Sequence, residues 1–202
     1  GAKVGYVFQM RDPFRDECGM LLSGANSVTV KNTIIHFMHC MGFLAQNSGN
    51  ITVDGLSVLP ERGRTAAAAS DILHFSGCRG KVSIKNGCFK GAHDDAVNIH
   101  GTHLIITERN VADNLLTLRF MHPQTFGIGG FKTGDRIAAV NPDTLLYEGE
   151  AEVTEVTELS AREIRLGIKG DILPFKNGFA VENISATPEA EIENNYFERI
   201  PT

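Results

Sequence analysis

A short recurring pattern limits the folds that this chain can adopt. Three residues alternate apolar, polar and apolar, and after one more polar residue comes Asn or Gly; such triplets begin at Val28, Ile51 and Val82, and a weaker copy occupies residues 189–195. Strict alternation over a few residues is typical of short strands, and Asn or Gly tolerates the left-handed backbone of a tight turn. Repeats of roughly 20–50 residues indicate stacked units. Units made only of strands and turns predict a parallel β-helix, in which each coil packs on its neighbours; an ordinary β-sandwich is the alternative.

A second strand precedes each triplet, and in two units aspartates accompany it. Residues 71–75 and 93–100 take the same place in neighbouring units, so Asp71 and the pair Asp94 and Asp95 fall on matching corners. Since neighbouring strands stack about 4.8 Å apart, we expect these carboxylates to be close in space. Successive residues of a regular strand face opposite ways. Both Asp94 and Asp95 therefore face one cleft only if the backbone bends there.

The pattern changes after about residue 104 and returns only at Glu189. Between them lie longer alternating strands with hairpin turns, up to about residue 169. We predict an all-β chain in three parts: β-helix coils with the active-site acids (1–104), an inserted small antiparallel β-barrel-like domain (105–175), and a truncated return to the β-helix (176–202). A solenoid that stops in mid-pattern exposes strand edges, so we expect a truncated chain, or a partner such as a second copy of the chain at that end.

Composition argues against several classes of protein. The net charge is -5 with no run of Lys or Arg, so nucleic acid is not an expected partner. No apolar run approaches the roughly 20 residues of a membrane span, and no signal peptide opens the chain. The 4 cysteines form no CxxC pair, and in a chain of 202 residues they are interpreted as small buried hydrophobic residues. Phosphate-loop and dinucleotide motifs do not occur, so we expect no cofactor.

Carboxylates beside small residues point to acid/base chemistry. Two carboxylic acids suffice to hydrolyse a glycosidic bond, one protonating the leaving oxygen and the other activating water or attacking directly. Crowded like charges raise one pKa and so supply the acid. Asp71, Asp94 and Asp95 are the catalytic candidates, and turn capping is their structural alternative. Three further side chains are expected to bind sugar hydroxyls or to orient an aspartate: His74, Asn98 and His100.

A metal site is the competing interpretation of the same stretch. His93, His100 and His103 could ligate an ion together with Asp94 and Asp95. The residues around them alternate like a strand, whereas metal phosphohydrolases with a His-Asp pair carry it on helices. We therefore expect no metal.

Several motifs resemble one family of enzymes. They are Met41-Gly42-Phe43-Leu44-Ala45-Gln46, Asp71 with His74-Phe75 and Gly77-Cys78-Arg79-Gly80, and the string DDAVNIHGT at 94–102. The chain is similar over nearly its whole length to glycoside hydrolase family 110, bacterial exo-α-1,3-galactosidases that remove terminal galactose from glycans. Because members are far longer, the resemblance implies a central fragment. It also implies a right-handed β-helix with a barrel inserted, inversion without a metal, and Asp71, Asp94 and Asp95 as the acidic residues. It further implies a bacterial periplasmic or extracellular location.

Two other functions fit the same pattern. One is a glycan-binding or structural module that keeps the groove without turnover. The other is a different polysaccharide hydrolase or lyase that acts on pectic chains. Acidic substrates favour a basic cleft. The central stretch offers mainly four basic residues, which are Arg64, Arg79, Lys81 and Lys85. So few basic residues disfavour a pectic substrate.

Overall fold

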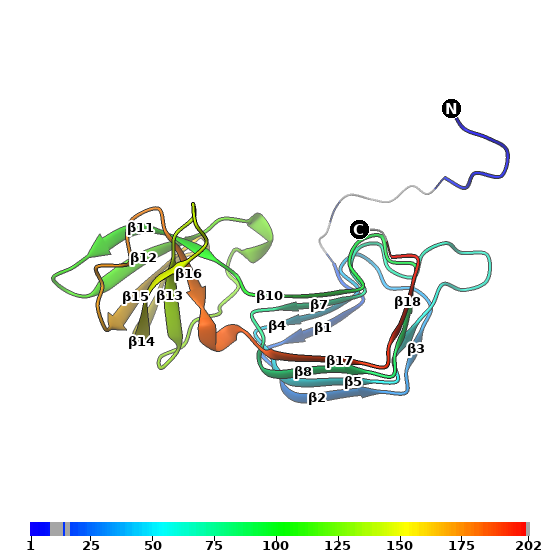
Figure 1. Ribbon diagram of the computed structural model, residues 1–202, viewed down its shortest axis with the longest axis horizontal. Helices are drawn as coiled ribbons and strands as arrows, with labels where there is room; N and C mark the ends of the chain where they lie inside the picture. The colour runs from blue at the N-terminus through cyan, green and yellow to red at the C-terminus, as the bar shows by residue number, and fades with distance from the viewer. Residues whose placement is uncertain (9–13, 15–16, 201–202) are drawn as a thin grey trace.

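The protein is built from strands. The computed structural model describes residues 1–8, 14 and 17–200. Figure 1 shows two bodies side by side, a unit of parallel sheets that we call the three-sheet unit and a barrel. Two helices, η1 (Pro123–Thr125) and η2 (Ile184–Ala186), are 3-10 turns of three residues each. Within the described residues, no helix has the length and apolar character to cross a membrane.

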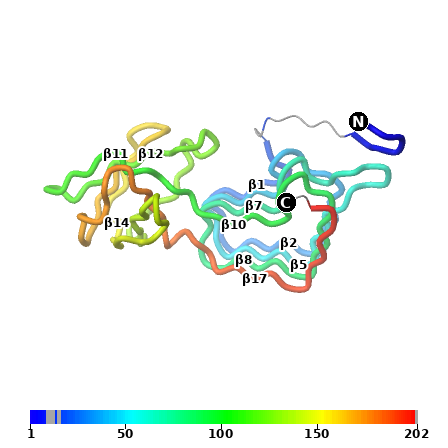
Figure 2. The backbone as a smooth tube through the Cα atoms, turned by 45° about the horizontal axis from the view of Figure 1, so that its top comes forward, coloured from blue at the N-terminus to red at the C-terminus, as the bar shows by residue number. Residues whose placement is uncertain are grey.

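The three-sheet unit contains three parallel four-stranded sheets, which form its walls (Figure 2). The first, which we call the site sheet, has the order β1 (Met20–Ser23), β4 (Phe43–Gln46), β7 (Leu73–Ser76), β10 (Val97–His100). The second has the order β2 (Asn26–Lys31), β5 (Gly49–Asp54), β8 (Arg79–Lys85), β17 (Glu189–Glu193). The third has the order β3 (Ile34–Ile35), β6 (Ser57–Val58), β9 (Cys88–Lys90), β18 (Tyr196–Glu198).

The repeated triplets are in register in the second sheet, as their spacing predicted. Val28 pairs with Ile51, Ile51 with Val82, and Val82 with Ala190. The turns that follow are left-handed, with φ of 50° at Asn32, 71° at Gly55 and 55° at Asn86. Asn and Gly adopt this backbone with little strain, which is why the sequence places them after each triplet.

Alternation along these strands fills the core between the sheets. Phe43 and Phe75 are fully buried, and their rings lie 5.9 Å apart at 50°, a tilted contact that aromatic pairs favour. Ile51 and Val53 of β5, and Val82 and Ile84 of β8, are also buried. Outward residues of the site sheet are left free to form a binding surface.

The predicted fold class, a right-handed parallel β-helix with an inserted barrel-like domain, is corrected by the sheet topology. The structure is all-β with a closed barrel, but the remaining strands form three four-stranded parallel sheets, and the residues that the structure describes show no right-handed β-helix. Alternating triplets with Asn or Gly turns encode parallel pairing of neighbouring units. They encode neither a handedness nor a continuous helical path, and the resemblance alone supplied the right hand.

The barrel is a closed antiparallel sheet of six strands, so the predicted barrel is confirmed. Its strand order is β11 (Leu104–Asn110), β12 (Leu115–Phe120), β15 (Glu163–Lys169), β14 (Tyr147–Ser160), β13 (Arg136–Val140), β16 (Ala180–Asn183). Inward residues such as Leu116, Ile137 and Val153 are fully buried. The three-part division at 104 and 175 remains a prediction.

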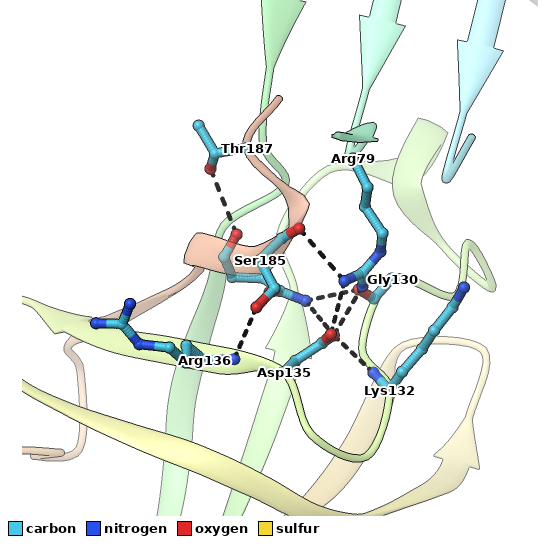
Figure 3. Close-up of polar contacts among 8 residues, drawn as sticks. Arg79, Gly130, Lys132, Asp135, Arg136, Ser185 and Thr187 are labelled. Atoms are coloured by element: carbon cyan, nitrogen blue, oxygen red, sulfur yellow. Dashed lines mark hydrogen bonds and ion pairs between the residues drawn. The ribbon is translucent and has the colours of Figure 1, made fainter. Parts of the chain in front are cut away.

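A partly buried ion pair joins the barrel to the three-sheet unit (Figure 3). The guanidinium of Arg79, from β8, donates to both carboxylate oxygens of Asp135 at 2.6 and 2.7 Å. It also donates to the carbonyl oxygens of Gly130 at 2.9 Å and Ser185 at 3.4 Å. Burial would raise the pKa of Asp135, but hydrogen bonds from Arg79, Asn183 and the Lys132 backbone outweigh it and lower the pKa.

The cysteines of the structure are free thiols. Cys40 and Cys78 are buried, in agreement with their interpretation as small hydrophobic residues, whereas Cys18 and Cys88 are partly exposed. Burial raises the pKa of Cys78, so its thiol is a poor nucleophile at neutral pH.

Candidate active site

The outward face of the site sheet carries two rows of side chains. Parallel register aligns His74 with Leu44 and Asn98, and it aligns His100 with Ser76. These residues alternate with Leu73, Phe75 and other core residues, because successive side chains of a strand face opposite ways. The alternation that builds the core therefore also presents the polar rows to the outside.

Asp71 lies two residues before β7 and is held firmly. It is only 2% exposed. His74 Nδ1 contacts its Oδ2 at 2.6 Å, Asn98 Nδ2 donates to Oδ2 at 3.3 Å, and Ser70 Oγ donates to Oδ1 at 3.3 Å. Burial would raise the pKa of Asp71, but these hydrogen bonds and the nearby imidazole outweigh it, so the pKa is lowered. Asp71 is thus an ionised carboxylate at neutral pH.

Asp94 and Asp95 join Asp71 from the neighbouring unit. The backbone bends at residues 93–94, and both side chains line the same pocket as Asp71. Asp94 is half-buried and Asp95 is exposed. Carboxylate oxygens, one from each of the three aspartates, lie within 4.8 Å of one another. The stacking expected from their spacing in the sequence therefore brings the three acids together.

Two histidines continue the hydrogen-bonded group that begins at Asp71. His74 Nε2 lies 2.8 Å from His100 Nε2, and His100 Nδ1 lies 2.7 Å from the carbonyl oxygen of Gly101. The side chains expected to bind sugar or an aspartate, His74, Asn98 and His100, all line the pocket. His74 and Asn98 contact Asp71, and His100 contacts His74.

The pocket has a volume of about 540 Å³, within the usual range for small-molecule sites. The barrel supplies part of its lining from the loop after β12, which sequence reasoning missed: Met121, His122, Gln124, Thr125 and Ile128. A loop longer than about ten residues between predicted strands, rich in Gly, is a signal that could have marked this segment as functional. Leu44 and Gln46 were also missed, although their register with His74 and Ser76 places them on the same face.

The alternative metal set does not form. Among the described residues, the close group of potential ligands is Asp71, Asp94 and Asp95. His93, His100 and His103 are not part of it. Lys and Arg are also missing from the described residues that line the pocket, so its charge does not suit a polyanionic chain.

Comparison of the sequence with known proteins relates the chain to a family. A family model described as GLAA-B beta-barrel domain II matches residues 115–174, which lie within the barrel. An alpha-1,3-galactosidase A of Bacteroides thetaiotaomicron is 42% identical over 201 residues, covering 97% of this chain. An alpha-1,3-galactosidase A of Akkermansia muciniphila is 41% identical over 99% of the chain, and an alpha-1,3-galactosidase B of Phocaeicola vulgatus is 34% identical over 96%.

This chain belongs to the α-1,3-galactosidase family. The resemblance noted from the sequence motifs is therefore confirmed. The chain spans about a third of the length of these relatives, 35% of the first and 34% of the other two. The roles of individual residues in the pocket remain predictions.

Proposed function

We propose that this protein is a glycoside hydrolase that removes terminal α-1,3-linked galactose from glycans. One observation carries the proposal: three carboxylates from neighbouring units converge in a pocket large enough for a sugar. Side chains that can form hydrogen bonds with sugar hydroxyls, including Ser76, Asn98 and His100, line the pocket beside the acids. The names of the relatives, which are α-1,3-galactosidases, support galactose and the α-1,3 linkage.

We assign Asp71 the part of general base or water holder. Its lowered pKa keeps it ionised at neutral pH, so it is unsuited to donate a proton. Three donors hold its two oxygens, and it is buried, so it is better placed to orient a water than to swing out and attack a sugar. The acid is then Asp94 or Asp95, which line the same pocket and lie close to Asp71.

We propose inversion at the anomeric carbon, on the strength of the family resemblance and of the fixed position of Asp71. The spacing of the acids argues the other way. Inverting enzymes generally separate their two carboxyl groups by roughly 6.5–9.5 Å, and retaining ones by roughly 5–5.5 Å, whereas oxygens of these three aspartates lie within 4.8 Å of one another. The anomer of the first-released galactose, followed by NMR, decides between the two outcomes.

Activity on a panel of galactosides tests the proposal. An α-1,3-galactosyl disaccharide should release galactose, and an α-1,4-linked one should be a poorer substrate. Asp71→Asn, Asp94→Asn and Asp95→Asn should each reduce kcat, by about 10²–10⁴-fold for a general acid or base. Asp143→Asn is the matched control, since Asp143 is exposed and outside the pocket lining. Asp-to-Asn variants of the three acids that stay within a few-fold of the parent refute the roles.

The competing function is a glycan-binding module without turnover. It predicts that titration with an α-galactoside gives a binding isotherm while no galactose is released over long incubation. It also predicts that Asp94→Asn or Asp95→Asn alters affinity alone. Because the chain spans only about a third of its relatives, the assay should include a longer protein that contains this chain.

We also propose a location outside the cytoplasm, in the periplasm or at the cell surface, where the glycans of the proposed reaction are found. Fractionation of the source cells tests it.

A second proposal is a homo-oligomer formed through one end of the three-sheet unit. There β10, β17 and β18 are the last strands of their sheets in the part of the chain that the structure describes, and light scattering measures the mass.

A further inference from the structure

The contact between His74 and His100 sets a condition on how many protons the site holds. A neutral imidazole has one nitrogen that donates and one that accepts, and only the protonated ring donates from both. The two rings contact each other through Nε2 at 2.8 Å. The protons on the other two nitrogens therefore determine what the shared contact can be.

Acceptors fix the outer nitrogen of each ring. The carbonyl oxygen of Gly101, 2.7 Å from His100 Nδ1, can only accept, so that nitrogen carries a proton. An ionised Asp71, 2.6 Å from His74 Nδ1, imposes the same on His74. With both rings neutral, the two Nε2 atoms would then face each other with lone pairs at hydrogen-bond distance. If His100 carried its proton on Nε2 instead, its unprotonated Nδ1 would face the carbonyl oxygen of Gly101. Two acceptors would again be in contact, now at that end of the ring.

The orientation of the rings confirms that the two nitrogens point at each other. Their centroids lie 4.8 Å apart and their planes make an angle of 85°. A separation of 4.8 Å is close to the largest that a 2.8 Å contact between ring nitrogens permits. The rings therefore meet end to end, which is the geometry of an N–H···N hydrogen bond and not of stacking.

We infer that His74 and His100 share one additional proton between their Nε2 atoms, so that Asp71 and the two rings form a single unit with no net charge. The proton count is the same if Asp71 holds a proton and donates it to His74. Two neutral histidines beside an aspartate would instead carry a charge of minus one. A buried carboxylate and an adjacent cation satisfy each other, which suits the buried position of Asp71.

The shared proton makes His100 a positioning residue. It fixes the ring of His74, and His74 in turn orients the carboxylate of Asp71. Loss of the proton at high pH would set two lone pairs against each other and turn one ring away. Under the proposed glycosidase function, on which this consequence depends, activity then falls on the alkaline side of the pH profile.

Nuclear magnetic resonance tests the proton directly and needs no activity. In protein labelled with ¹⁵N-histidine at pH 7, we expect both Nδ1 atoms protonated and a third proton on, or averaged between, the two Nε2 atoms. In His100→Gln that signal should vanish, because the side-chain amide donates to His74 Nε2 without titrating. Spectra of the parent protein with two neutral rings and unprotonated Nε2 atoms overturn the inference, whatever the activity.

The pH profile supplies the second arm of the test. The alkaline limb of His100→Gln should move upward by at least about one pH unit, whatever its maximal rate, because the amide keeps the hydrogen bond. His103→Gln is the control and should keep the parental limb, since His103 lines the same pocket without contacting His74. The other titratable groups of the pocket are Glu17, Cys18, Asp94, Asp95 and His122. An unchanged limb in His100→Gln refutes the positioning role, and a shared proton without galactose release refutes only the proposed function.

Discussion

Removing the Arg79 side chain should loosen the barrel from the three-sheet unit and destabilise the protein. Arg79 makes two hydrogen bonds to Asp135 and one each to the carbonyl oxygens of Gly130 and Ser185. The side chains of Arg79 and Asp135 are 21% and 7% exposed. We call these contacts of Arg79 with Asp135, Gly130 and Ser185 the clamp. Arg79→Met keeps the apolar stem and removes all four hydrogen bonds, so it tests the clamp with little loss of packing.

The size of the loss follows from what remains around Asp135. Breaking a buried ion pair by removing one partner costs about 3–5 kcal/mol. In Arg79→Met, Asp135 Oδ2 keeps hydrogen bonds from the Lys132 backbone at 2.8 Å and from Asn183 at 2.7 Å. The carboxylate charge therefore remains partly stabilised. We therefore expect the lower end, about 3 kcal/mol. In a cycle with Asp135→Asn, the coupling energy should be about 2 kcal/mol.

Urea unfolding measures both quantities. The change in stability is taken from the midpoint with the slope unchanged. Arg119→Met is the matched control, because Arg119 and Glu163 form an exposed pair with side chains 54% and 30% exposed. Such pairs contribute about 0.2–1 kcal/mol. If Arg79→Met costs no more than Arg119→Met, the clamp does not hold the two bodies together as argued.

The effect should also depend on pH in one direction. The pKa of Asp135 is lowered in the folded protein, so its contribution is present above its unfolded pKa of about 3.9 and is lost as pH falls through the folded value. The difference in stability between the parent and Arg79→Met should therefore shrink below about pH 4. A difference that stays constant from pH 7 to pH 3 would contradict a charge-based clamp.

Three further predictions follow from single positions. Gly42→Ala should lower the free energy of unfolding by about 1–3 kcal/mol and reduce activity. At Gly42 φ is +57°, and an added Cβ would lie 2.4 Å from the Asp71 carbonyl oxygen. Gly101→Ala is the control in the same unfolding assay, because a Cβ there would meet no atom within 4 Å. Asp71 has a lowered pKa, so the stability that its charge contributes is lost as pH falls below about 4. In Asp71→Asn the urea midpoint should therefore fall less steeply with decreasing pH than in the parent protein. A hydrogen bond to Glu182 raises the pKa of Tyr147 to about 12, so Tyr147→Phe should remove the last step of an absorbance titration.

Local pattern in the sequence was enough to predict the pairing of units. Triplets at Val28, Ile51 and Val82 pair in parallel because alternation fixes which face is buried and the turn residues fix where each strand ends. The same logic placed Asp71 beside Asp94 and Asp95, whose oxygens converge. Pairing in register is a local property, and it could therefore be inferred without a structure.

The path of the chain through space was not predictable in this way. The right-handed parallel β-helix was wrong because handedness and the closure of sheets depend on how connections cross the core, which no triplet records. The contact between His74 and His100 depends on ring orientations set by Asp71 on one side and Gly101 on the other. Sequence indicated that these histidines were polar groups of the site, but not that they meet.

The barrel wall of the pocket depends on contacts between residues that are far apart in the chain. Ile128 lines the pocket, and the next two residues are held from the three-sheet unit: Asn47 Nδ2 donates to the Gly129 carbonyl at 2.6 Å, and Arg79 donates to that of Gly130. The loop that faces the acids is thus tied to the three-sheet unit that carries them. Because the same guanidinium binds Asp135, a change that frees the barrel also frees the pocket wall. Stability of the clamp and the shape of the site should therefore vary together.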